Sequence, residues 1–248
     1  MSGHSKWATI KHKKGAADKA RAKIFNKIAR QLEVAAREGG GDINSNATLR
    51  TMVQKAKAAQ MTNDAIDRAV KRGTGENDGG TFEAITYEGY APGGVALLID
   101  VLTDNRNRTG AEVRNVFSKL GGSMAEPGAV SWQFRRAGVL HVPSDVAEDD
   151  VMLVALDAGA QDVAASGDTW EITCEPNAVY DVKSALEEAG ISVLSAESTM
   201  ISSTTIDVTD LEAAKKVLRI VDALEDNDDV QDVFGNFDIS IELMEAVG

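Results

Sequence analysis

The sequence predicts an α+β multidomain protein, in which a basic arm and a three-helix domain precede two α/β domains. Apolar residues recur at helical spacing up to Gly73, and patterns typical of strands begin only after the polar stretch 73–80. Charge is divided just as sharply. Residues 1–37 hold ten Lys/Arg and two acidic residues, whereas residues 137–248 hold four Lys/Arg and 25 acidic residues, in a chain of net charge −13. A chain of 248 residues is long enough to form two or three domains, each with its own core.

The N-terminal region predicts a domain of three helices over residues 1–80. Residues 1–16 lack apolar periodicity and are expected to form an extended basic arm. A first helix is predicted from Ala17 to the triple glycine that starts at Gly39. Its core stripe consists of Ile24, Ile28, Leu32 and Ala35. Two further helices are expected, one after Ser45/Asn46 as N-cap and one from near Thr62 to Gly73.

The next segment, 81–136, mixes strands with one helix. Strands are predicted over 82–88, over the apolar run 95–102 and over 130–134. Between the last two, Thr109 and Glu112 have the spacing of a capping box, which predicts that a helix opens there.

Residues 137–203 predict a complete unit with the order βαββαβ. Strands are expected over 139–142, 161–165, 169–175 and 191–196, and helices end at Gly159 and Gly190. This order is that of the ferredoxin-like split unit.

The last segment, 204–248, predicts a strand, a helix opened by a second capping box (Thr209 and Glu212) and a strand over 228–234. Such a remnant cannot bury both faces by itself. We therefore expect 204–248 to pack onto 81–136 as one discontinuous domain, into which 137–203 is inserted.

No catalytic or metal motif is found. The phosphate-binding, dinucleotide-binding, Gly-x-Ser-x-Gly and His-Glu-x-x-His patterns are all missing, and the three histidines do not form a cluster. The single cysteine, Cys174, lies on the apolar face of a predicted strand and is interpreted as an inert core thiol. Asp226-Asn-Asp-Asp229 resembles the start of a calcium loop but lacks its glycine, which favours a solvated helix end. We expect no enzymatic activity and no cofactor.

The basic N-terminus is the strongest functional signal. Its dense cations can neutralise phosphates and release counterions, and an aromatic side chain among them can stack on an unpaired base. The alternative is a solubilising tail whose tryptophan packs on the helical domain. The candidate nucleic-acid-binding residues are Lys6, Trp7, Lys11, His12, Lys13 and Lys14 of the arm, and Lys19, Arg21, Lys23, Lys27 and Arg30 of the first helix.

A second candidate is the segment 104–108, which carries Arg106 and Arg108 between a buried strand and the predicted helix. Two arginines in a loop at a helix N-terminus can cradle a phosphate. Alternatively, both arginines pair with carboxylates of the acidic half.

Several motifs make the chain resemble the YebC/PmpR family over its whole length. These are Gly3-His-Ser-Lys-Trp7, Lys23-Ile-Phe25, Gly39-Gly-Gly-Asp42, Asn63, Tyr87-Glu-Gly-Tyr-Ala-Pro-Gly-Gly94 and Asp104-Asn-Arg-Asn-Arg-Thr109. The family includes bacterial proteins called probable transcriptional regulators and a mitochondrial translational activator of cytochrome oxidase. The resemblance implies three domains, one interrupting another, with nucleic acid contacted by the basic arm and helix.

Two functions remain open at this point. The resemblance favours a DNA-binding transcriptional regulator in the cytoplasm, acting on promoter DNA. The alternative is a translation factor that binds ribosomal or messenger RNA and relieves stalling at difficult sequences such as proline runs. The acidic half repels a long duplex and suits a basic protein partner. No apolar run reaches the roughly 20 residues that span a membrane, so no membrane partner is expected.

Overall fold

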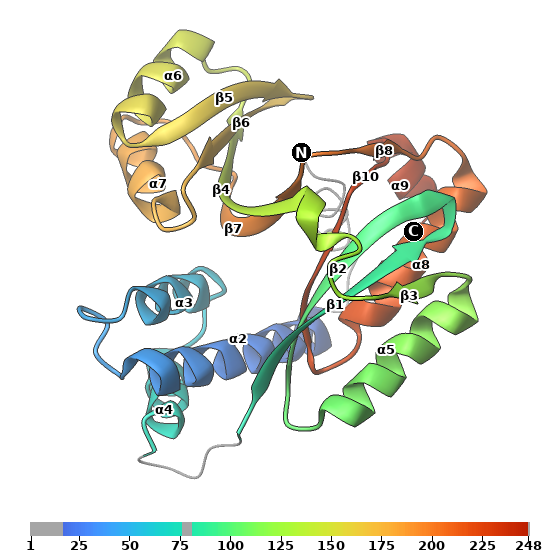
Figure 1. The fold of residues 1–248 in the computed structure, drawn as a ribbon. Helices are drawn as coiled ribbons and strands as arrows, with labels where there is room; N and C mark the ends of the chain where they lie inside the picture. The colour runs from blue at the N-terminus through green and yellow to red at the C-terminus, as the bar shows by residue number, and fades with distance from the viewer. Residues whose placement is uncertain (1–16, 76–80, 248) are drawn as a thin grey trace. The chain divides into compact units, whose positions relative to one another are not determined.

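The computed structural model describes residues 17–75 and 81–247, with side chains from Arg21 onward. The protein is α+β, with an N-terminal three-helix region followed by β-sheets and interspersed helices (Figure 1). By its contacts the chain divides into two compact units. We call residues 132–205 the central unit, and the described residues on either side of them the flanking unit.

The N-terminal region consists of α2 (Ala17–Gly39), α3 (Ala47–Ala58) and α4 (Asn63–Gly73). The predicted caps are confirmed, because the side chains of Asn46 and Thr62 each accept a backbone N–H of the following first turn. The predicted apolar stripes meet in one core, whose buried members include Ile28, Leu32, Leu49, Ala56 and Ile66. Helix α4 approaches α2 closely at Gly73, where a Cβ would lie 2.8 Å from that of Ala36.

The remainder of the flanking unit is a four-stranded antiparallel sheet with helices. Its strands are β1 (Glu83–Ala91), β2 (Val95–Thr103), β3 (Ser123–Ala125) and β9 (Val230–Gly235), in the order β3-β1-β2-β9. Helices α5 (Arg106–Leu120) and α8 (Leu211–Glu225) cover one face of it (Figure 1). Strands β8 (Ile206–Asp207) and β10 (Phe237–Asp238) form a short parallel pair, and α9 (Ile241–Val247) follows. Strand β9 pairs with β2, although more than 120 residues of sequence separate the two strands.

Both predicted capping boxes are wrong about where the helix begins. Helix α5 begins at Arg106, one turn before Thr109, because Asn105 accepts the N–H of Arg108. Helix α8 is capped by Asp210, which accepts the N–H of Ala213. The cap of α5 stands before the predicted Thr109, and the cap of α8 stands one residue after the predicted Thr209. In both helices an Asn or Asp side chain satisfies a free N–H group of the first turn.

The central unit has the chain order β4 (Phe134–Pro143), α6 (Glu148–Asp157), β5 (Ala160–Ser166), β6 (Thr169–Cys174), α7 (Val179–Glu188) and β7 (Ser195–Ser202). Its sheet is antiparallel, with the order β5-β6-β4-β7. A separate core lies between this sheet and its two helices. Cys174 is buried in that core, and its burial raises the pKa of the thiol to about 11.

The prediction and the structure differ at three further places. Residues 131–133 form a 3-10 turn, and the strand expected there begins only at Phe134. The last strand of the central unit covers 195–202 instead of 191–196, since its pairing with β4 runs from Ser195 to Ser202. At the C-terminus the sequence prediction missed β10 and α9.

No helix within residues 17–75 and 81–247 is long and apolar enough to cross a membrane.

Candidate nucleic-acid interface

The predicted nucleic-acid-binding residues fall into two groups. Lys6, Trp7, Lys11, His12, Lys13 and Lys14 lie outside the described residues, as does the side chain of Lys19. The structure places the others, which are Arg21, Lys23, Lys27, Arg30, Arg106 and Arg108. Arg21 is exposed and has no ion-pair partner within the described side chains.

Two lysines of α2, Lys23 and Lys27, contact the C-terminal end of α8. Lys23 Nζ lies 2.9 Å from a carboxylate oxygen of Asp226 and 3.1 Å from its carbonyl oxygen. Lys27 Nζ donates to the carbonyl of Glu225 at 2.8 Å. The last carbonyls of a helix lack intrahelical partners and form the negative end of its dipole, so two ammonium groups suit this place. Burial lowers the pKa of Lys27, and the neighbouring carboxylates offset part of that effect.

Arg30 continues this row of cations from α2 to β9. Its guanidinium lies 2.8 Å from Asp229 Oδ1 and donates to the carbonyl of Asp228 at 2.9 Å. It also lies over the ring of Phe82, 5.2 Å from the centroid. Lys23, Lys27 and Arg30, which the sequence predicted to contact nucleic acid, are therefore engaged by the acidic segment 225–229.

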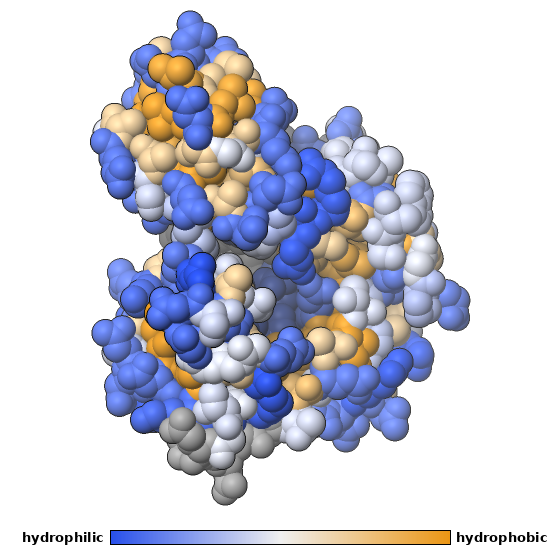
Figure 2. Space-filling view, turned by 60° about the vertical axis from the view of Figure 1, so that its left-hand side comes forward, coloured by the Kyte–Doolittle hydropathy of each residue, from blue (hydrophilic) through white to orange (hydrophobic). Residues whose placement is uncertain are grey.

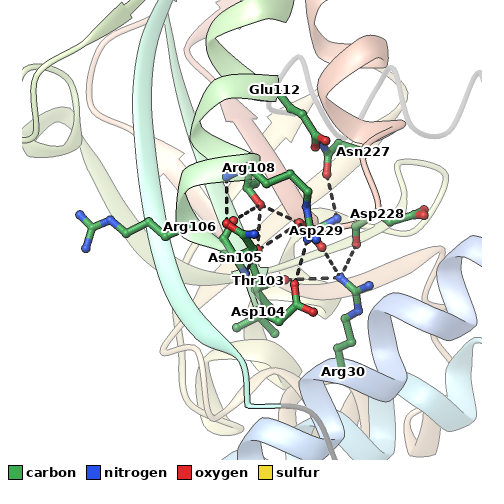
Figure 3. Close-up of polar contacts among 12 residues, drawn as sticks. Arg30, Thr103, Asp104, Asn105, Arg106, Arg108, Glu112, Asn227, Asp228 and Asp229 are labelled. Atoms are coloured by element: carbon green, nitrogen blue, oxygen red, sulfur yellow. Dashed lines mark hydrogen bonds and ion pairs between the residues drawn. The ribbon is translucent and has the colours of Figure 1, made fainter.

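Asp229 is the centre of a polar cluster that joins four elements (Figure 3). It lies immediately before β9 and is buried, with 6% of its side chain exposed. Its Oδ2 accepts hydrogen bonds from Arg108 at 2.6 Å, from Thr109 at 2.6 Å and from Thr103 at 3.1 Å, while Oδ1 accepts from Arg30. These donors come from α5, the end of β2 and α2. The segment predicted to be a solvated helix end thus contains a buried carboxylate.

The donors explain the electrostatics of Asp229. Burial alone would raise the pKa of its carboxyl, but hydrogen bonds from Thr109, Arg108, Arg30 and Thr103 lower it to about 2. The group is an anion with four donors, which is the arrangement that makes a buried charge tolerable.

Arg106 and Arg108 do not form the predicted loop, because both lie in the first turn of α5. Arg108 bridges Asp104 at 2.9 Å and Asp229, as the alternative interpretation expected. Figure 3 shows Arg106 pointing away from this cluster. Its side chain is 66% exposed and lies 3.4 Å from the exposed Glu83.

Arg106 belongs to a small cationic surface beside Tyr87. Arg106, Gly110 and Arg114 are spaced by four residues on α5 and share one face of that helix. Tyr87 of β1 lies over Gly110 and donates a hydrogen bond to the carbonyl of Arg106 at 3.3 Å. Burial raises the pKa of Tyr87, whereas the positive charges of Arg106 and Arg114 act to lower it. Two exposed arginines and an aromatic ring are thus brought together.

The neighbouring Glu88 has a structural role. It is 6% exposed and accepts the backbone N–H groups of Gly128, Val130 and Ser131 at 2.6 to 2.9 Å. Burial opposes its ionisation, but these donors lower the pKa of the carboxyl below its ordinary value. Glu88 thereby holds the segment that leads into the central unit.

His141 is buried in the central unit. Its Nδ1 lies 2.9 Å from Ser195 Oγ and its Nε2 lies 3.3 Å from Glu171 Oε2. All three residues are direct cross-strand neighbours on β7, β4 and β6. The hydrogen bond with His141 acts to lower the pKa of Glu171, against the effect of burial. Within the described ranges no group of three or more His, Cys, Asp or Glu side chains could hold a metal.

Comparison with known proteins identifies the family. The family model for the TACO1/YebC N-terminal domain matches residues 5–76, and the model for the TACO1/YebC second and third domain matches residues 82–237. The chain belongs to the TACO1/YebC family. This confirms the resemblance found in the sequence, and it places the chain in a non-enzymatic regulatory family.

Relatives within the TACO1/YebC family are similar over their full length. A protein of Halothermothrix orenii named probable transcriptional regulatory protein is 52% identical and covers 100% of this chain and 99% of its own. A protein of Geobacter sulfurreducens with the same description is 52% identical and covers 100% of both chains. The crystal structure of a conserved hypothetical protein from Aquifex aeolicus has a TM-score of 0.77 and 43% identity, and covers 90% of this chain and 92% of its own.

The sequence analysis did not identify Asp229 as the centre of a polar cluster, nor Tyr87 and Arg114 as neighbours of Arg106. The spacing of Arg106, Gly110 and Arg114 was a usable signal, because one helical face carries all three. No comparable signal existed for Asp229. Its partners meet it only because β9 pairs with β2, and a single sequence does not reveal that pairing.

Proposed function

We propose that this member of the TACO1/YebC family is a nucleic-acid-binding regulatory protein, with DNA-binding regulation of transcription as its first candidate function. The observation that carries the proposal is the distribution of positive charge. The acidic segment 225–229 engages Lys23, Lys27 and Arg30. Residues 1–21 still hold six Lys/Arg and only one acidic residue. Positive charge at this density binds phosphates through counterion release.

The proposed interface has two parts. Lys6, Lys11, Lys13 and Lys14 contact the phosphate backbone, with Trp7 available to stack on a base. Arg106 on α5 supplies a second contact, together with Tyr87 and Arg114. The names of the relatives, probable transcriptional regulatory protein, favour promoter DNA as the target.

One observation favours a translation factor as the second candidate. Residues 137–248 carry 25 acidic residues and four Lys/Arg, which repel a long DNA duplex. A particle built of RNA and basic proteins has binding partners for both the basic arm and the acidic half of this chain. The basic arm would bind ribosomal or messenger RNA, and the acidic half would bind a basic protein. Either function places the protein in the cytoplasm.

The domain organisation proposed with this function is a helical domain (1–80), a discontinuous α/β domain (81–136 with 204–248) and an inserted ferredoxin-like domain (137–203). The strand order β5-β6-β4-β7 with two helices supports the ferredoxin-like assignment. The pairing of β9 with β2 supports the discontinuous domain.

A binding experiment tests the proposal. Fluorescence anisotropy of the full chain is measured with a labelled 20-base-pair DNA duplex, an RNA hairpin and a single-stranded RNA, from 50 to 300 mM salt. The variant Lys11→Glu/Lys13→Glu/Lys14→Glu should weaken binding at least tenfold and flatten the salt dependence, by about 0.9 per lost phosphate contact on a duplex. Its matched control is Lys57→Glu/Arg68→Glu/Lys71→Glu, which makes the same charge change at exposed sites of α3 and α4. Equal losses in both variants would contradict binding by the arm.

A second measurement separates the two functions. Crosslinking in cells, followed by sequencing of the bound nucleic acid, distinguishes promoter DNA from ribosomal and messenger RNA. Enrichment of promoter DNA supports the transcriptional function, and enrichment of ribosomal RNA supports the alternative. Recovery of neither above the level of the arm variant would overturn both.

A further inference from the structure

Helix α6 of the central unit carries apolar side chains on its outer face as well as on its inner face. Val151 and Ala155 are completely buried against the sheet, as expected for a helix that covers it. Leu153 and Leu156, however, are 67% and 44% exposed. Because they are three residues apart, they lie next to each other on the same side of the helix. Figure 2 shows apolar residues gathered on the helical face of this unit.

Exposed acidic residues flank this apolar ridge. At 100° per residue, Asp150 and Asp157 lie on one side of Leu153. Leu156 and the half-buried Met152 lie on the other side, together with the exposed Asp149 of the first turn. All three aspartates are exposed. The surroundings have the same sign, since residues 137–203 contain 13 acidic residues and a single Lys/Arg, Lys183. The pattern is thus an apolar ridge with an acidic edge.

This pattern restricts what can bind there. An apolar ridge accepts the apolar face of another helix, with contacts spaced at i, i+3, i+4 and i+7. The acidic edge attracts Lys and Arg and repels nucleic acid, anionic lipid and acidic proteins. A second copy of α6 would bring carboxylates against carboxylates. Charge complementarity therefore selects a basic amphipathic helix.

We propose that the outer face of α6 is the docking site for a basic amphipathic helix of a partner protein. Leu153 and Leu156 provide the apolar contact, and Asp150 and Asp157 pair with Lys or Arg of the partner. A helix of ten residues is about 15 Å long, so a partner segment of about three turns matches it. The proposal deepens the proposed function, because it locates the basic protein partner of the acidic half.

The probe is a synthetic 16-residue peptide with leucines at i, i+3, i+4 and i+7 and with Lys/Arg beside them. A scrambled isomer of the same composition keeps the charge but loses the amphipathic face. Binding to the full chain is measured by anisotropy at 150 mM salt, and amide chemical shifts locate the site. We expect at least tenfold tighter binding of the amphipathic peptide than of its isomer, with shifts concentrated on α6. Equal binding of the two peptides would overturn the proposal.

Three variants separate the contributions. Leu153→Ser/Leu156→Ser should weaken peptide binding at least tenfold, and Asp150→Asn/Asp157→Asn should weaken it about three- to tenfold at this salt concentration. Leu194→Ser is the matched control, because Leu194 is 60% exposed and lies outside α6. The replaced side chains are exposed, and circular dichroism melts of each variant verify folding. The proposal fails if Leu194→Ser weakens binding as much as the double leucine variant.

A crosslinking experiment identifies the occupant in cells. A photoreactive residue replaces Leu153 in one variant and Leu194 in another. Crosslinks from position 153 to a Lys/Arg-rich helix of another protein support the proposal. Crosslinks mainly to residues 1–16, to a second copy of the chain or to an acidic protein contradict it.

The same variants keep the two proposals apart. Nucleic-acid binding of the α6 variants should match that of the unchanged chain, and the arm variant should still bind the peptide. If the unchanged chain binds nucleic acid but not the peptide, only the docking-site proposal fails. If it binds the peptide but not nucleic acid, only the proposed nucleic-acid function fails.

Discussion

Replacing Asp229 by asparagine should destabilise the flanking unit more than any other single loss of charge in the segment 225–229. The change keeps the size of the side chain but turns one carboxylate oxygen into an N–H donor. Whichever way the amide is oriented, its NH2 group faces a guanidinium, because Arg108 donates to Oδ2 and Arg30 donates to Oδ1. A donor is then placed against a donor inside a buried cluster.

Two independent arguments give the magnitude. The pKa of Asp229 falls from 3.8 to about 2, which corresponds to about 2 kcal/mol of stability held by the ionised form at neutral pH, at 1.36 kcal/mol per unit. Breaking a fully buried ion pair costs about 3–5 kcal/mol. Arg108 and Arg30 are 44% and 27% exposed and can be rehydrated, so the lower end of that range applies. We expect a loss of about 2–4 kcal/mol.

The assay is hydrogen exchange measured by mass spectrometry at neutral pH, with urea unfolding as a second measure. Amides of β2, α5 and β9 should exchange roughly 30 to 700 times faster in Asp229→Asn, given tenfold per 1.4 kcal/mol. The sheet of the central unit serves as an internal reference, because Asp229 belongs to the flanking unit. Asp228→Asn is the matched control. In Asp228, Arg30 contacts the backbone carbonyl, which the substitution leaves in place. Figure 3 shows the carboxylate of Asp228 pointing away from Arg30.

The pH dependence provides the test of the electrostatic argument. Because the carboxyl pKa of Asp229 is depressed in the folded state, its stabilisation is complete above about pH 4 and is lost as the pH falls towards 2. The stability difference between the unchanged protein and Asp229→Asn should therefore shrink over that range. The reasoning is refuted if Asp229→Asn is no more destabilising than Asp228→Asn. It is also refuted if the stability difference between the unchanged protein and Asp229→Asn does not change with pH.

Three further predictions concern buried groups. Glu88→Gln should cost about 1–3 kcal/mol in urea unfolding, because an amide cannot accept all three backbone N–H groups; a cost below 0.5 kcal/mol, on the order of a typical surface substitution, would contradict this. Gly138→Ala should destabilise the central unit by about 1–3 kcal/mol, since its Cβ would overlap the side chains of Val179 and Cys174; an unchanged melting temperature would show that the core yields freely. The thiol of Cys174, buried and with its pKa raised to about 11, should resist iodoacetamide at pH 8 until urea unfolds the central unit; labelling at the denatured rate in native buffer would disprove its burial.

Local patterns in the sequence predicted the helical region well. The stripes of α2, α3 and α4 repeat every three to four residues. The capping side chains of Asn46 and Thr62 mark the starts of α3 and α4, and Gly73 marks the end of α4. These signals act within one or two turns, so a single segment contains all the information. The errors at Thr109 and Thr209 have the same local origin, because two residues able to cap stood within one turn and the sequence pattern did not rank them.

The sequence by itself determined that residues 1–37 are basic, that residues 137–248 are acidic and that the chain carries the motifs of its family. It also showed that none of the catalytic motifs searched for is present. Only the tertiary structure decided what the charges do. Arg108 and Asp229 are 121 residues apart, and Lys23 and Asp226 are 203 apart, and they meet because β9 lies beside β2 and α8 ends against α2. A side chain that pairs internally and one that faces solvent can have identical local sequences. The energy that separates them comes from burial and from partners distant in the chain.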